Sequence, residues 1–86
     1  MVNEIVLDVH ELQPPEPMQK ALDALEQLEQ GQYLKIIHRM QPFPLYEILL
    51  DNGFKYKVTN SDISAYDIYV WRADDQEAKK MIEDLL

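Results

Sequence analysis

At 86 residues, 47% of them hydrophobic, the chain has room for one small globular domain. It contains no cysteine, which excludes disulfides, thiolate metal sites, iron–sulfur clusters and cysteine nucleophiles. Its formal net charge of −8 disfavours a general nucleic-acid binder, because such a protein needs a basic surface to displace counterions.

The first half of the chain has the pattern of a strand, a helix and a second strand. A short apolar run with β-branched residues predicts a strand over residues 5–9. Apolar residues at helical spacing predict a helix over about 15–30, with prolines in its first turn and Gly31 as its C-terminal cap. Residues 33–38 predict the second strand.

The second half of the chain predicts a helix, two strands and a terminal helix. A turn at 41–44 leads into a helix that begins at Pro44 and ends at Asn52-Gly53. Residues 54–58 alternate apolar side chains with Lys55 and Lys57, which is typical of a protected edge strand. A turn at 60–64 and a strand at 65–72 follow, and Asp74-Asp75 opens the last helix.

The element order predicts an α/β two-layer sandwich. In a β-α-β-α-β-β chain, two right-handed crossovers place both main helices on the same side of one sheet. We assign residues 1–73 to this domain and residues 74–86 to an acidic amphipathic helix of the same domain. That helix is too short to be stable alone in water, so we expect it to pack on the sheet or against a second copy.

The prolines of the first helix carry a family resemblance. Pro14, Pro15 and Pro17 follow the first strand, and the sequence resembles the TusA/SirA-like sulfur carriers, whose motif there is Cys-Pro-x-Pro. Pro14 stands where the cysteine would be. The segment 38–46, followed by Gly53, resembles a bacterial branch of that superfamily, the domain of unknown function DUF2249.

The resemblance covers about residues 4–72 and implies a mixed four-stranded sheet of order 1-2-4-3, with the fourth strand antiparallel to the others. It also implies sulfur relay for the members that carry the cysteine. Persulfide transfer needs a thiolate, so that chemistry does not extend to Pro14.

Polar residues follow the first two predicted strands and form our candidate site. Parallel strands end at one sheet edge, where ligands of open α/β sheets bind. We therefore expect His10, His38 and Arg39 to converge near Glu16 and to bind a ligand. In the alternative interpretation each is an ordinary loop residue paired with a neighbouring carboxylate, such as Glu11 or Glu16 for Arg39.

Metal and cofactor chemistry has only weak support at this edge. Two histidines and a carboxylate could bind a transition metal, and Met18 and Met40 could add a haem or copper ligand. Helical spacing assigns Met18 to the core, and we assign no cofactor and no metal. The first helix start is a poor anion site, because its prolines lack N–H donors and Glu16 is negative.

The outer face of the predicted sheet gives a further alternative. Alternation points an aromatic-rich set of side chains away from the helices: Tyr33, Lys35, Ile37, Tyr69 and Trp71. Such a face could stack single-stranded RNA, but the charge of −8 opposes this. We expect the terminal helix or a second copy to cover it.

The residues offer no nucleophile–base pair, so we do not predict an enzyme. Our leading hypothesis is a binding or accessory module whose partner is an unknown protein or a small ligand. The alternatives are a docking partner in a sulfur-relay or redox and metal-handling pathway, and an RNA-binding protein. No apolar run approaches a membrane span and the N-terminus is acidic, so we expect a cytoplasmic monomer or homodimer without membrane contact.

Overall fold

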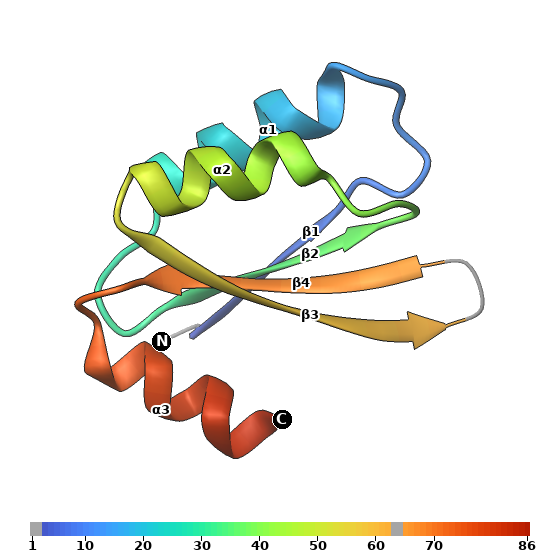
Figure 1. Ribbon diagram of the computed structural model, residues 1–86. Helices are drawn as coiled ribbons and strands as arrows, with labels where there is room; N and C mark the ends of the chain where they lie inside the picture. Colours follow the sequence, from blue (N-terminus) through green and yellow to red (C-terminus); the bar gives the residue numbers. More distant parts are fainter. Residues whose placement is uncertain (1–2, 63–64) are drawn as a thin grey trace.

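The computed structural model describes residues 3–62 and 65–86, and the order of its elements is the predicted one. The elements are β1 (Glu4–Asp8), α1 (Glu16–Glu26), β2 (Tyr33–His38), α2 (Phe43–Asp51), β3 (Phe54–Asp62), β4 (Ala65–Arg72) and α3 (Gln76–Leu85). Figure 1 shows α1 and α2 side by side on one face of the sheet, which confirms the two-layer arrangement. None of the described helices is long and apolar enough to cross a membrane.

The four strands form one mixed sheet in the order β1-β2-β4-β3. β1 runs parallel to β2, with Ile5 opposite Leu34 and Asp8 opposite Ile37. β4 is antiparallel to both β2 and β3. This confirms the predicted order and direction of the strands, and it places the ends of β1 and β2 at one edge.

The main core lies between the sheet and the two helices. Ala21 and Leu25 of α1, together with Leu45 and Leu49 of α2, are buried against the sheet. The residues of the sheet that complete this cluster are Leu34, Ile36, Phe54, Ile68 and Val70. In the helices these buried residues recur at helical spacing, and in the strands they follow two-residue alternation, as expected for side chains that face one core.

β3 is an edge strand, as its lysines predict. Tyr56 and Val58 pack against the core, while Lys55 and Lys57 are exposed on the opposite face. The strand is longer than predicted and continues to Asp62. The predicted turn at 60–64 is therefore wrong in its first part, and residues 63–64 lie outside the described residues.

α1 ends at Glu26, earlier than the predicted residue 30. The N–H groups of Gln27 and Leu28 bond to the carbonyls three residues back, which tightens and closes the helix. The predicted cap at Gly31 is therefore wrong, because Gln27 caps α1 and Gly31, with a φ of 80°, lies in the turn that follows. Two hydrogen bonds hold this turn: Arg72 of β4 donates to the Leu28 carbonyl, and the Gly31 N–H donates to Asp75, the residue that caps α3.

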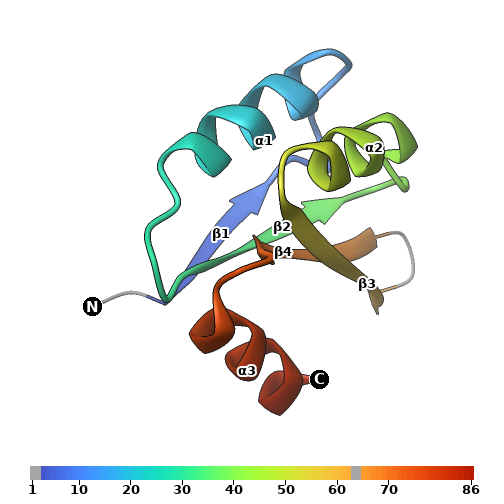
Figure 2. The ribbon, with the colours of Figure 1, turned by 60° about the vertical axis from the view of Figure 1, so that its left-hand side comes forward.

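α3 covers the outer face of the sheet, on the side opposite α1 and α2 (Figure 2). Ala78 and Ile82 form a second buried cluster with Tyr33, Tyr69 and Trp71. This confirms the expectation that the terminal helix covers the aromatic face. Tyr33, Tyr69 and Trp71 are buried, so these three side chains do not offer an open surface on which bases could stack.

The start of α3 is tied to the turn before β2. The carboxylate of Asp75 accepts a hydrogen bond of 3.0 Å from the Ala78 N–H, which caps the helix. Its other oxygen accepts a hydrogen bond of 2.7 Å from the Gly31 N–H. Asp75 therefore fixes both the helix and the turn, which explains why a carboxylate is buried here.

Candidate functional site

His10 lies just after β1 and is held by acids of its own segment. Its Nδ1 is 2.5 Å from Oδ1 of Asp8, and its Nε2 is 3.9 Å from Oε1 of Glu11. The hydrogen bond with Asp8 raises the pKa of His10 and lowers the pKa of the Asp8 carboxyl. For His10 the structure therefore favours the interpretation of a loop histidine paired with a neighbouring carboxylate.

His38, the last residue of β2, is buried, with 8% of its surface exposed. Its Nδ1 accepts a hydrogen bond of 3.2 Å from the Met40 N–H, so the neutral ring carries its proton on Nε2. Within the part of the chain that the structure describes, Nε2 has no hydrogen-bond partner. Burial, and secondarily the charge of Arg39, lower the pKa of His38. The ring is a neutral donor at neutral pH.

Arg39 and Glu16 do not complete the cluster that the sequence predicts. Arg39 is exposed, and no ion pair joins it to Glu11 or Glu16. It lies close enough to both histidines for its charge to act on the pKa of each. Glu16 is exposed in the first turn of α1. His10, His38 and Arg39 thus share one edge as predicted, and of these three residues His38 lines the pocket described next.

That pocket, which we call the proline pocket, lies between the starts of α1 and α2 above the end of β2 and has a volume of about 210 Å³. All five prolines of the chain line it: Pro14, Pro15, Pro17, Pro42 and Pro44. Ala21, Ile36 and Leu45 supply further apolar surface. Proline rings are rigid and carry no N–H, so the walls of the proline pocket are apolar and preorganised.

The polar groups of the proline pocket are few. They are the imidazole of His38 and the side chain of Gln41, whose Oε1 already accepts a hydrogen bond of 3.3 Å from the Tyr46 hydroxyl. Met18 and Met40 also line the pocket, and Met40 is half exposed at its mouth. An apolar cavity with one directed donor suits an uncharged group that carries a hydrogen-bond acceptor.

Sequence reasoning identified His38 but missed the proline pocket. It interpreted the prolines as features of two helix starts, and the two proline-bearing segments are more than twenty residues apart in the sequence. The available signal was the clustering of every proline beside the ends of two parallel strands. Among the described residues, no group of three histidine, cysteine, aspartate or glutamate side chains is placed to hold a metal ion.

The comparison with known proteins identifies the family. Residues 6–72 match the family model described as uncharacterized conserved protein, DUF2249. The matched segment runs from within β1 to the end of β4 and includes every residue of the proline pocket, whereas α3 lies outside it. No curated protein and no solved structure matches the chain. Since the match covers most of its length, the chain belongs to the DUF2249 family of uncharacterized conserved proteins.

Proposed function

We propose that this chain is a non-enzymatic binding module that captures an apolar group bearing a hydrogen-bond acceptor in the proline pocket. The observation that carries the proposal is the buried His38, which lines an apolar cavity with an unused Nε2–H. The Nε2–H is not sealed from solvent, so a bound acceptor would replace water as its partner inside an apolar cavity, a net gain of about 0.5–1.5 kcal/mol. The ligand is a side chain of a protein partner or a small molecule.

The size of the proline pocket limits what it can hold. Its volume of about 210 Å³ is below the range of ~300–1,000 Å³ that is usual for drug-sized ligands and cofactors. A leucine-sized or phenyl-sized group fits that volume, whereas a haem or a dinucleotide does not. The pocket therefore supports recognition of one apolar group rather than binding of a large cofactor.

A pair of variants tests this function. His38→Leu keeps an apolar side chain of similar size and removes the donor, so it should weaken binding of carbonyl-bearing fragments by about threefold to tenfold, the equivalent of one hydrogen bond. Arg39→Gln, at the neighbouring exposed position, should leave that binding unchanged. Ligand-observed NMR with a set of small amides and ketones measures both. If His38→Leu binds these fragments as tightly as the wild type does, His38 does not donate a hydrogen bond to the ligand and the proposal is contradicted.

A second candidate function is docking in a sulfur-relay pathway without carrying sulfur. It rests on the resemblance to TusA/SirA-like proteins, which places Pro14 at the position of the sulfur-carrying cysteine. Pro14 lines the proline pocket, so by this resemblance the proposed capture site would coincide with the position at which TusA/SirA-like sulfur carriers hold sulfur. Affinity capture from the native host tests it: a sulfurtransferase should be retained by the wild type and lost with His38→Leu. Capture of none would contradict this second function.

A further inference from the structure

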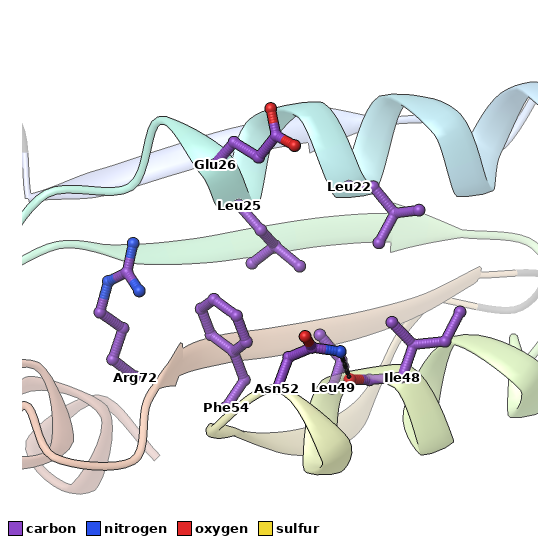
Figure 3. A pocket seen from close by; sticks show the side chains of 8 residues that line it. All are labelled: Leu22, Leu25, Glu26, Ile48, Leu49, Asn52, Phe54 and Arg72. Carbon is purple, nitrogen blue, oxygen red and sulfur yellow. Dashed lines mark hydrogen bonds between the residues drawn. The ribbon is translucent and has the colours of Figure 1, made fainter.

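A second cavity, which we call the Arg72 groove, lies between the C-terminal halves of α1 and α2 (Figure 3). Its volume is about 340 Å³, which is enough for a small organic ligand. Leu25, Leu49 and Phe54 form a buried apolar floor, and Leu22 and Ile48 are half-buried at its sides. The proline pocket uses the opposite ends of the same two helices, so the two sites are separate.

Arg72 stands at one end of this groove and is held in position by two contacts. Its Nη2 donates a hydrogen bond of 3.1 Å to the Leu28 carbonyl, and its guanidinium carbon lies 5.2 Å from the centre of the Phe54 ring. Figure 3 shows the guanidinium beside Phe54, at the opposite end of the groove from Leu22. A fixed guanidinium loses little side-chain entropy when it binds an anion.

The charge of Arg72 is not neutralised by the protein. The chain has 16 acidic and 8 basic residues, yet none of the described carboxylates forms an ion pair with Arg72. Asp75, which lines a cavity next to it, is already bonded to two backbone N–H groups. With one N–H given to Leu28, four of the five donors of the guanidinium remain for a ligand.

We propose that the Arg72 groove binds an amphipathic monocarboxylate, with the carboxylate on the guanidinium of Arg72 and the apolar chain over Leu25, Leu49 and Phe54. The apolar floor would remove the ligand's hydrocarbon chain from water, and the guanidinium would bind its carboxylate through a charge-assisted bidentate pair. Two other polar side chains line the groove. Asn52 already donates from its amide to the Ile48 carbonyl, and the exposed Glu26 repels an anion from the rim.

Octanoate is the probe, and isothermal titration of the whole chain measures its binding. We expect 1-octanol and octylamine to bind at least tenfold more weakly than octanoate, because neither can pair with Arg72. Arg72→Gln should weaken octanoate binding at least tenfold, whereas Glu26→Gln should strengthen it severalfold by removing the repulsion. Equal binding of octanoate and 1-octanol would overturn the proposal.

Because Arg72 also donates a hydrogen bond to the Leu28 carbonyl, replacing it could disturb folding. A second pair of variants therefore leaves Arg72 in place. Ile48→Glu puts a negative charge into the groove and should abolish octanoate binding. Leu50→Glu adds the same charge to the same helix at an exposed position and should leave binding unchanged. Equal loss in both variants would contradict a site in the groove. A contrary outcome would be that 2-aminooctanoate binds more tightly than octanoate and that Glu26→Gln weakens its binding. The ligand would then be a zwitterion whose amino group pairs with Glu26, and the assignment of a monocarboxylate would be overturned.

Discussion

The two histidines of this chain occupy opposite environments although they lie at the same sheet edge. The hydrogen bond that the His10 ring donates to the Asp8 carboxylate raises the pKa of His10 above its ordinary value of 6.5. Burial, and then the charge of Arg39, lower the pKa of His38 below the same value. One histidine is thus an exposed cation at mildly acidic pH, and the other is a buried neutral donor.

We predict that NMR titration of the two imidazole rings will give a pKa above 6.5 for His10 and below 6.5 for His38. Asp8→Asn should return the pKa of His10 toward its ordinary value and leave that of His38 unchanged. The Nδ1 of His38 should show the nitrogen shift of an unprotonated acceptor. Two rings that titrate together would contradict the burial of His38.

The same shifts determine how stability depends on pH. His10 has a raised pKa in the folded chain, so its contribution is full below the unfolded pKa and is lost as pH rises through the folded value. His38 has a lowered pKa, so the unfolded chain binds its proton first and stability falls as pH drops below the unfolded pKa. His38→Leu should therefore reduce the loss of stability on acidification, measured by urea unfolding at several pH values. An unchanged acid dependence in His38→Leu would contradict this.

At the scale of elements, α3 and the turn before β2 depend on one side chain. Asp75 accepts hydrogen bonds from the N–H groups of Ala78 and Gly31, and both bonds are buried. Asp75→Ala should lower the free energy of unfolding by roughly 2–4 kcal/mol, because it removes a helix cap and leaves the Gly31 N–H without a partner. Trp71, the only tryptophan, is buried under α3 and reports the transition by fluorescence.

Asp74→Ala is the matched control for Asp75→Ala. Asp74 is exposed and lies outside the helix cap, so we expect a change within about 0.5 kcal/mol. Equal destabilisation by both variants would mean that charge, rather than the two buried hydrogen bonds, holds α3.

At the scale of the whole molecule, local patterns predicted the fold and left its long-range polar contacts unpredicted. Alternation in β3 and β4 and helical spacing in α1 and α2 identify the core face, and right-handed crossovers then place both helices on one side. No periodicity relates Arg72 to the Leu28 carbonyl or Asp75 to Gly31, since each pair is 44 residues apart. These contacts hold residues Leu28 and Gly31 in the turn that follows the end of α1.

The candidate site was predictable only in part for the same reason. The parallel strands brought His10, His38 and Arg39 to one edge, which the sequence allows one to infer. Which side chain turns inward was not predictable, because the Met40 N–H orients His38 and the Asp8 carboxylate holds His10 outside. The proline pocket forms only when both proline-rich loops meet over β2, and this depends on tertiary packing.

The most direct test of the central claim is the response of the His38 imidazole nitrogens to N-acetyl-leucine methylamide, which joins a leucine side chain to two carbonyl acceptors. We predict a saturable shift of Nε2, with smaller shifts of the Met18 and Met40 methyl groups and none at Arg72. In His38→Leu the response of those methyl groups should saturate at about threefold to tenfold higher ligand concentration. An Nε2 resonance that stays fixed across the titration, while Arg72 or the outer surface responds, would contradict capture in the proline pocket.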